Sequence, residues 1–592
     1  MSGTDSLDFD IVFKDFDDPI AKEVVNSWVQ WKGARADWED RVEEVRKYRY
    51  ATSTYETTNI QNDHDHSTHT PKLAQIADNL SANYMMALFP HDDWLRFEGN
   101  DPESEEFDKR RAVLAYLSTK HRLSGFRNTI QRLIDDWIET GNCFGGVTYE
   151  QQAHLNPDTW EIHPGYIGPR VYRISPHDIV FNPLASSFEN SPKIIRSLKT
   201  LGELSRDMEE NPELGYSEDI IKKVHETRAA LRSWTDTEIN KHSQLQYDGF
   251  GSPSHYFKSG FVEILEFYGD IYDTNNNQFL KNYVITVVDR RWVIRMQPLN
   301  TWSGRPTIFH CGWRLRPDNL WAQGPLDNLV GMQYLINHLE NARADAFDQM
   351  TDPDRLIMGD VEIDVRGAAV DYYVVEGGSV QYLAPDTTIL NADFQIQRKE
   401  AQMEEYAGAP REAMGIRTPG EKTATEVQEL QNAASRIFQA KITYFEEQFL
   451  EKIINAEVEV ARRNLESTDI ARVIDDDLGV AEFLQITQED LSANGTVVPV
   501  GARHFARQAQ LAQNLMTFQQ VAMGDPLMIQ HFPSDRLARA WEDVLGFKRL
   551  EVYRRFGRIQ EEMEYQQLQM AAQEQLELQA QAGMGGEDEI PG

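Results

Sequence analysis

The chain has 592 residues, of which 41% are hydrophobic and 10% aromatic, enough apolar surface for several packed regions, which excludes a disordered chain. Its formal net charge of −36 argues against a protein that binds nucleic acid over its whole surface. The same charge is compatible with a channel through which nucleic acid passes without adhering. No apolar run approaches the roughly 18 residues of a membrane-spanning helix, and residues 1–18 show no apolar signal segment. The only two cysteines, Cys143 and Cys311, predict packed thiols in a reducing compartment.

Amphipathic helices dominate the first part of the chain, because apolar residues recur there every three or four positions. The predicted helices cover residues 20–50, 71–88 and 105–140, and the last one ends at Thr140-Gly141-Asn142. Short strands are predicted to follow at residues 143–149, 170–174 and 179–181.

Three histidines, His64, His66 and His69, lie in the polar break between the first two helices. With Asp63 and Asp65 they are a candidate metal site, since imidazole and carboxylate ligands suit zinc. Their spacing matches no standard zinc motif and no cysteine is near, so a polar loop is the default interpretation and a metal site the alternative.

The middle of the chain predicts charged helices over residues 200–245 and then a Gly/Ser/Tyr-rich boundary at residues 247–260. Strands at residues 261–267, 283–288 and 292–296 then predict an antiparallel meander.

A small β module between two helices follows. Gly324-Pro325 predicts the start of a helix over Pro325–Met350, and Asn391–Met414 reads as its partner. Between them, Tyr372–Val375 and Ser379–Leu383 predict a hairpin across a glycine turn.

The next helix is unusually long. Thr423 and Glu426 form a capping box, and no glycine or proline interrupts residues 421–478. Apolar residues then recur every three or four positions, at Val427, Leu430, Ala434, Phe438, Ile442, Phe445, Phe449, Ile453, Ala456 and Val460. A helix of about 40 residues spans roughly 60 Å and needs a second domain or neighbouring subunits to cover it.

The loop before this helix, residues 415–422, lies in a basic cluster of Arg411, Arg417 and Lys422. It is either a solvated turn or a loop that faces something anionic. After about residue 500, helices are predicted at residues 501–524 and 535–558, and no lysine or arginine follows Arg558. This basic-then-acidic ending indicates either a solvated helix pair or a surface for self-association or a partner.

Motifs for common chemistry are absent from the sequence: it has no phosphate-binding loop ending in Lys-Ser or Lys-Thr, no Gly-x-Ser-x-Gly and no His-Glu-x-x-His. No catalytic residue, cofactor or metal is therefore assigned, and the chain is not expected to be an enzyme.

Three motifs in this order resemble the portal (head-to-tail connector) proteins of tailed bacteriophages, especially the short-tailed podovirus type. The first is Ile76–Leu80 leading into Met85–Pro90 and Trp94, and the second is Thr140-Gly141-Asn142 after a long helix. The third is Thr423–Val427, which opens the long helix after the basic loop. Together with the helix–β–helix insert, the resemblance covers roughly residues 20–470.

The resemblance implies an α+β portal fold with an α/β wing, two stem helices flanking a small β clip, a long wing helix and a helical C-terminal crown. The implied regions are an acidic arm 1–19, wing 20–324, first stem helix 325–350, clip 351–390, second stem helix 391–414, channel loop 415–422, long wing helix 423–466, wing remainder 467–500, crown 501–558 and a partly disordered extension 559–592 with a helical barrel as one option.

The family also implies roles for residues. The channel loop would present Arg411, Arg417, Glu421 and Lys422 to DNA. The clip would meet other proteins through Arg355, Asp360, Asp371, Tyr372, Tyr373 and Glu376. The long helix would pack through Val427, Leu430, Phe438, Phe445, Phe449 and Ile453.

The expected assembly is a homo-oligomeric ring of twelve at the capsid vertex of the virion, assembled in the host cytoplasm. Its partners would be the large terminase subunit, tail adaptor and tail tube proteins, major capsid and scaffolding proteins, and double-stranded DNA, with no membrane. Two alternatives remain: a metal-dependent multidomain enzyme that uses His64, His66 and His69, and a non-portal scaffolding or interaction protein.

Overall fold

The computed structural model describes residues 18–50, 64–89, 94–100, 107–155, 162–210, 215–231, 261–273, 277–299, 301–351, 353, 355–359, 361–366, 369–374, 379–382, 392–407, 438–465, 469–474, 481–486, 491 and 495–499. The chain divides into two compact units, Met1–Val473 with Phe483–Pro499, and Ile474–Glu482 with Val500–Gly592. Few residues of the second unit are described, so the following account concerns the first.

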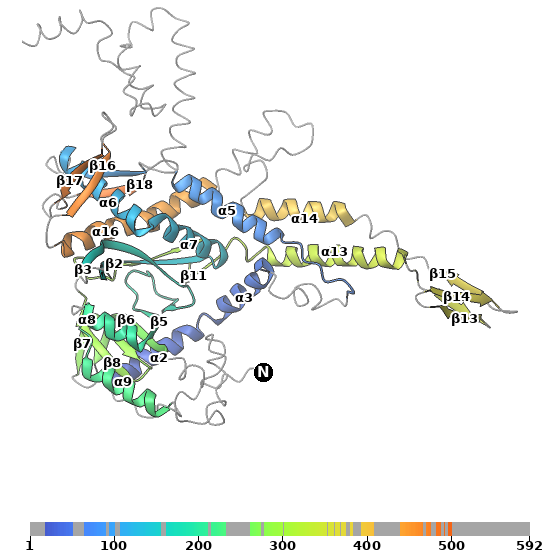
Figure 1. Ribbon diagram of the computed structural model, residues 1–592, viewed down its shortest axis with the longest axis horizontal. Coiled ribbons are helices and arrows are strands. Elements are labelled where there is room, and N and C mark those ends of the chain that lie inside the picture. Colours follow the sequence, from blue (N-terminus) through green and yellow to red (C-terminus); the bar gives the residue numbers. More distant parts are fainter. Residues whose placement is uncertain are drawn as a thin grey trace, which may run out of the picture. The chain divides into compact units, whose positions relative to one another are not determined.

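Helices and antiparallel strands form a mixed fold, which agrees with the α+β part of the predicted fold class (Figure 1). The helices are α2 (Pro19–Gly33), α3 (Ala36–Tyr50), α5 (Lys72–Leu88), α6 (Phe107–Ser124), α7 (Phe126–Glu139), α8 (Leu201–Glu210), α9 (Glu218–Leu231), α13 (Val330–Thr351), α14 (Ala392–Ala407) and α16 (Glu451–Asn464). The strands are β1 (Leu95–Gly99), β2 (Asn142–Leu155), β3 (Ile162–Ile174), β4 (Ile179–Phe181), β5 (Lys193–Thr200), β6 (Phe261–Asp273), β7 (Gln278–Val288), β8 (Trp292–Pro298), β9 (Ile308–Gly312), β10 (Arg314–Arg316), β11 (Asn319–Gln323), β12 (Arg355–Met358), β13 (Val361–Arg366), β14 (Ala369–Val374), β15 (Ser379–Tyr382), β16 (Asp469–Ile474), β17 (Ala481–Ile486) and β18 (Gly495–Pro499). Within these described ranges, no helix is long and apolar enough to cross a membrane.

A five-stranded antiparallel sheet, in the order β4-β5-β6-β7-β8, contains the predicted meander. Helices cover both faces of this sheet. Successive side chains along a strand point to opposite sides, so neighbouring residues pack against different helices. Leu265 and Phe267 pack with Trp28 of α2 on one face, whereas Val262 and Ile264 pack beneath α8 and α9 on the other. The meander prediction is confirmed.

A second sheet, in the order β3-β2-β9, carries α7 and α16. Gly145 of β2 makes this packing possible, since a Cβ atom there would lie 3.0 Å from Phe449 and 3.1 Å from Ile453. Cys143 and Cys311 pair across β2 and β9, and both are free, buried thiols, as predicted.

Two of the predicted long helices are each divided. Between α2 and α3 the chain turns at Arg35, whose buried guanidinium donates to the carbonyl oxygens of Pro176, at 2.8 Å, and His177, at 2.6 Å. Between α6 and α7 it turns at Gly125, whose φ of 69° is left-handed and favours glycine. The helical content was predicted correctly, but these two breaks were not.

The helix predicted over Pro325–Met350 begins later than expected, at Val330, and ends at Thr351. The segment before it is a turn, because the Asp327 carboxylate accepts from Gly324 N at 3.2 Å and Leu329 N donates to Leu326 O at 2.9 Å. Its partner α14 begins at Ala392, one residue after the predicted start, and lies beside α13 (Figure 1).

The strand pairing predicted for the β module is wrong. β14 pairs with β13, and β15 pairs with β12, so the hairpin runs through Arg366 and Ala369. The Glu376-Gly377-Gly378 stretch instead leads from β14 to β15.

The described part of the long helix begins at residue 438 and ends at Asn464. It is not one uninterrupted α-helix, because Glu446–Leu450 forms a π-helical turn before α16 begins. Such a turn holds one extra residue, which the regular spacing of apolar residues in the sequence does not reveal.

Candidate functional site

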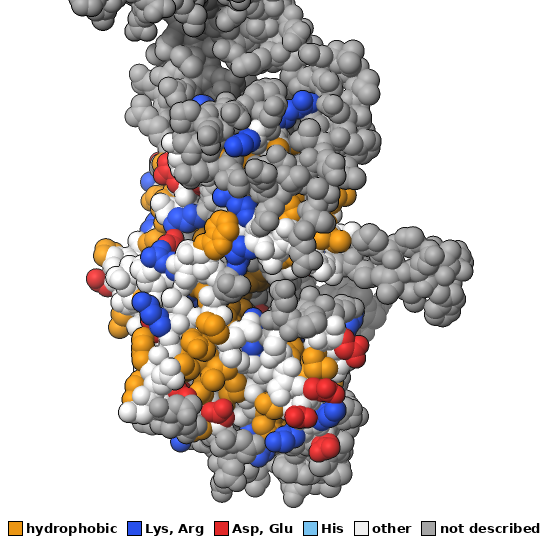
Figure 2. Space-filling model, turned by 90° about the vertical axis from the view of Figure 1, so that its left-hand side faces the viewer, with side chains coloured by type: hydrophobic (Ala, Val, Ile, Leu, Met, Phe, Trp, Pro, Cys, Tyr) orange, Lys and Arg blue, Asp and Glu red, His pale blue; other side chains and the backbone are white. Residues whose placement is uncertain are grey.

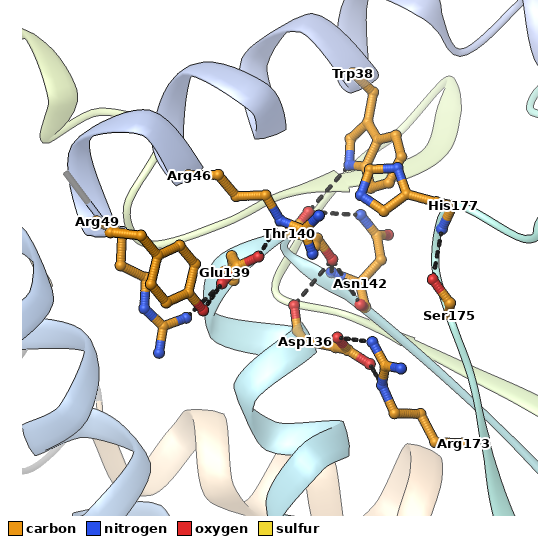
Figure 3. Close-up of polar contacts among 11 residues, drawn as sticks. Trp38, Arg46, Arg49, Asp136, Glu139, Thr140, Asn142, Arg173, Ser175 and His177 are labelled. Carbon is orange, nitrogen blue, oxygen red and sulfur yellow. Dashed lines mark hydrogen bonds and ion pairs between the residues drawn. The ribbon is translucent and has the colours of Figure 1, made fainter. Parts of the chain in front are cut away.

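The Thr140-Gly141-Asn142 turn connects α7 to β2 and is a junction of several elements (Figure 3). Thr140 accepts a hydrogen bond from Trp38 Nε1 through its carbonyl oxygen at 3.0 Å. The fully buried Asn142 donates to Ala322 O at 3.1 Å and accepts from Ala322 N at 3.0 Å. One side-chain amide therefore satisfies both backbone groups of a residue on β11, which fixes that strand beside β2.

Gly141 is required in this turn for two reasons. Its φ is +75°, and a Cβ atom would lie closer than 3.0 Å to the backbone of Gln323 and Gly324. The motif that carries part of the family resemblance is therefore a packing constraint in this chain.

Glu139, the last residue of α7, lies at the centre of a buried charge network (Figure 3). It accepts from Arg49 at 2.7 Å, from the Tyr50 hydroxyl at 2.7 Å and from Arg46. Burial by itself raises the pKa of Glu139, but these hydrogen bonds and the arginine charges together outweigh it, so the pKa of Glu139 lies below its usual range. The pairs tie the end of α3 to the end of α7.

Asp136, one turn earlier on α7, makes a bidentate pair with Arg173 of β3, with distances of 2.5 and 2.7 Å. Burial raises the pKa of Asp136 to about 6, and the arginine only partly counteracts this. Two carboxylates three residues apart thus have pKa values displaced in opposite directions. Both are engaged by arginines and about nine-tenths buried, so the cluster positions α3, α7 and β3 rather than meeting a substrate.

The segment His64–Pro71, here called the strap, runs along α13. Its backbone is held by side chains on α13 that are spaced four residues apart and so share one helix face. Asn337, Asn341 and Asp345 accept from the backbone N–H groups of Thr70, Thr68 and His66. Gln333 donates to Thr70 O and also accepts from Leu73 N at the start of α5. The segment predicted as a polar loop is therefore an ordered extended strap.

The three histidines of the alternative metal site each have a different partner. His64 lies 2.8 Å from Asp345, His66 lies 2.7 Å from Asp348, and His69 lies 2.9 Å from Asn337. In the described part of the chain, no three His, Cys, Asp or Glu side chains form a group that could hold a metal ion. The three imidazoles therefore lie along α13 and do not meet at one point where a metal ion could bind.

The residues expected in the clip fall partly within the described strands. Arg355 is on β12 opposite Tyr382, and Asp371, Tyr372 and Tyr373 are on β14 opposite Asp364, Ile363 and Glu362. Asp360 and Glu376 lie outside the described residues. The module follows α13 and precedes α14 in the chain.

All four residues expected in the channel loop, Arg411, Arg417, Glu421 and Lys422, lie outside the described residues, as do Val427 and Leu430. The other long-helix residues lie against α5, α7 and β2. Phe438 stacks on Tyr84 with ring centroids 4.7 Å apart, and Phe445 lies 4.9 Å from Trp137. Phe449 and Ile453 are fully buried over Gly145.

Two buried carboxylates on the same helix were missed by the sequence reasoning. Glu446 and Glu457 are both fully buried, and Glu457 lies 2.7 Å from His121 Nε2 of α6. A signal was available, since each follows a predicted core residue, Ile442 or Ile453, by four positions and so shares its face.

Charge is unevenly distributed over the surface. In Figure 2, Lys and Arg side chains are spread over the upper half of the drawn face, whereas acidic and basic side chains alternate along its lower edge.

In comparisons with known proteins, no protein-family model and no curated protein matches the chain.

Proposed function

We propose that this chain is a portal protein that forms a ring at one capsid vertex, through which double-stranded DNA is packaged and ejected. The observation that carries the proposal is the path of the chain from α13 through β12–β15 and back through α14, which lies beside α13. A two-helix stalk with a small β module between its helices fits a stem and a clip. The order of the three sequence motifs around it gives independent support.

The stalk helices carry exposed apolar side chains, which supports assembly with further copies. Phe347 and Met350 on α13 are 52% and 45% exposed, and Phe394 and Tyr406 on α14 are 70% and 60% exposed. Large apolar side chains grouped on one pair of helices are typical of surfaces that are covered in an assembly.

Net charge fits the proposed task of letting a duplex pass. A ring of subunits with a formal charge of −36 each repels phosphates, so DNA moves through with little adhesion in either direction. Arg417 and Lys422 of the expected channel loop would then supply sparse contacts to phosphates, which carry no sequence information.

The sequence has no phosphate-binding motif, so in this proposal a separate large terminase subunit supplies ATP hydrolysis. The β module would be the docking point for the terminase during packaging and for the tail adaptor and tail tube afterwards. Scaffolding and major capsid proteins would surround the ring in the virion.

The first test is the mass and outline of the purified protein by mass photometry and negative-stain imaging. Twelve copies of 68.1 kDa give particles of roughly 0.8 MDa with a central hole. A compact monomer or dimer at micromolar concentration, with or without bound metal, would contradict the proposal, and an elongated oligomer without a hole would favour an interaction protein.

A second test concerns the channel loop. Arg417→Ala with Lys422→Ala should leave the ring intact but lower the amount of DNA packaged and retained, because two phosphate contacts per subunit are lost. Lys47→Ala with Lys222→Ala is the matched control, since it also removes two positive charges, from exposed residues paired with Glu43 and Glu218. Equal packaging by both variants would remove the loop from the proposal.

A further inference from the structure

Neutral amides hold most of the strap. The Gln333 side chain accepts from Leu73 N at 2.9 Å and donates to Thr70 O at 2.5 Å. Asn341 accepts from Thr68 N at 2.8 Å and donates to Thr68 O at 3.0 Å. Asn341 therefore meets Thr68 as a neighbouring β-strand would, and neither amide changes its charge with pH.

At the other end of the strap, hydrogen bonds to α13 involve titratable side chains. Asp345 Oδ1 accepts from His66 N at 3.1 Å, and its Oδ2 lies 2.8 Å from His64 Nδ1. The second ring nitrogen of His64, Nε2, lies 2.8 Å from Nδ1 of His338. Within a few residues, the groups that hold the strap thus change from neutral amides to titratable side chains.

The His64–His338 contact sets a limit on protonation. Two imidazole nitrogens 2.8 Å apart can share one proton as a hydrogen bond, with one ring donating and the other accepting. When both rings are protonated, each nitrogen carries a hydrogen pointed at the other and both rings are positive, so the contact must open.

We propose that the strap and α13 form a proton-operated latch, in which a second proton on the His64–His338 pair frees the His64–His66 end of the strap while the amides continue to hold Thr68 to Leu73. This inference does not depend on the proposed function.

Groups around the pair set the point at which the latch opens. A singly protonated pair keeps its contacts, because both ring nitrogens of a charged His64 can donate, Nδ1 to Asp345 and Nε2 to His338, so only a second proton breaks the contact. Burial lowers the pKa of His338, and a positive charge on His64 lowers it further. Because His338 is harder to protonate in the closed latch than in a free chain, where its pKa is 6.5, the closed state loses stability as the pH falls below that value.

The remaining charged neighbours act more weakly or are engaged elsewhere. His66 and Asp348 form a more exposed pair, with side chains 38% and 70% exposed, so solvent screens their interaction. On the same helix, Arg343 pairs with Glu340 and with Asp393 of α14. Further along the strap, burial lowers the pKa of His69, which lies beside Asn337 and 6.4 Å from the ring of Tyr48.

Hydrogen exchange of single strap amides, read by mass spectrometry and corrected for intrinsic rates, tests the latch in the full-length protein. Between about pH 8 and about pH 5, protection of the His66 amide should fall roughly tenfold or more, whereas protection of Thr70 should change less than about twofold. Amides of α7 serve as the reference for global unfolding. An equal loss of protection at His66 and in α7, or no loss at His66, would overturn the proposal.

His338→Asn gives the decisive comparison, because the asparagine amide can donate to Nε2 of neutral His64 through its NH2 group and accept from charged His64 through its oxygen. The variant should keep the strap closed at both pH values. His66→Gln is the matched control, since it removes a histidine from the same strap but leaves the pair intact, and it should retain the pH response. His64→Gln should abolish the response even if His338→Asn folds poorly. Retention of the full response in both variants of the pair would sink the latch.

Discussion

Two polar networks in the first unit show different ways to bury polar groups. Around Glu139 and Asp136, carboxylates are removed from water and compensated by arginines on neighbouring elements. Along α13, Gln333, Asn337 and Asn341 are fully buried but carry no charge.

The difference lies in what each network specifies. An ion pair in a buried position is costly to break, because removal of one partner leaves an uncompensated charge. An amide that pairs with backbone groups is indifferent to the side chains of the strap, so it fixes the path of the chain rather than the identity of its residues. The network at Glu139 should therefore dominate stability, and the amides on α13 should dominate local order.

The largest effect is expected at the charge network. Glu139→Ala should lower the free energy of unfolding by about 3–5 kcal/mol, because it leaves Arg49 buried without its main partner. Chemical denaturation followed by tryptophan fluorescence measures this. The pKa of Glu139 is lowered, so its contribution is present above the ordinary glutamate range and is lost as the pH falls through the lower folded value.

Glu43→Ala is the control for that prediction. Glu43 also pairs with a basic side chain, Lys47 at 3.1 Å, but it is 68% exposed. Exposed pairs contribute about 0.5 kcal/mol or less. Similar losses in the two variants would mean that burial of the network is not what makes it matter.

The turn beside the network should be the next most sensitive position. Gly141→Ala should cost about 3 kcal/mol, because the new Cβ meets the backbone of Gln323 and Gly324 in addition to the strain of a positive φ. Gly125→Ala separates the two causes, since its φ is +69° but open space surrounds it. It should cost only about 1 kcal/mol in thermal or chemical unfolding. Equal costs would show that the close approach to Gln323 is unimportant.

A smaller loss of stability than at Glu139 or Gly141 is expected along α13. Asn341→Ala leaves the backbone N–H and carbonyl of Thr68 without their partner and should cost about 2 kcal/mol. Unlike the loss at Glu139, this loss should not vary between neutral and acid pH, because no charge is involved. A pH-dependent cost for Asn341→Ala, in unfolding measured at several pH values, would contradict the distinction between the networks.

Sequence periodicity predicted most of the helices and the meander, because their apolar residues repeat at the period of the element. It did not predict the breaks at Arg35 and Gly125, since each depends on a contact or backbone angle that a helical pattern does not encode. The pairing of β13 with β14 was missed because the two candidate glycine turns compete and the strands between them are short.

The polar networks were harder still to predict. Gln333, Asn337 and Asn341 carry a visible four-residue spacing, but nothing in the sequence says that residues 68–73 lie on that face. Glu139 likewise reads as an ordinary charged residue at a helix end. Its importance depends on the position of α3 next to it. That position is set by the packing of the whole unit and not by the local sequence pattern.

The π-helical turn at Glu446–Leu450 is also the place where the helix can lose a residue without a change in which side chains face the core. A deletion elsewhere in the helix rotates all later residues by about 100° and would turn Ile454 and Val458 away from the core. A deletion of the exposed Glu447 would instead convert the wide turn into a regular one and leave the faces on both sides aligned. In lineages of this protein, single-residue gaps within the helix should therefore accumulate at this turn.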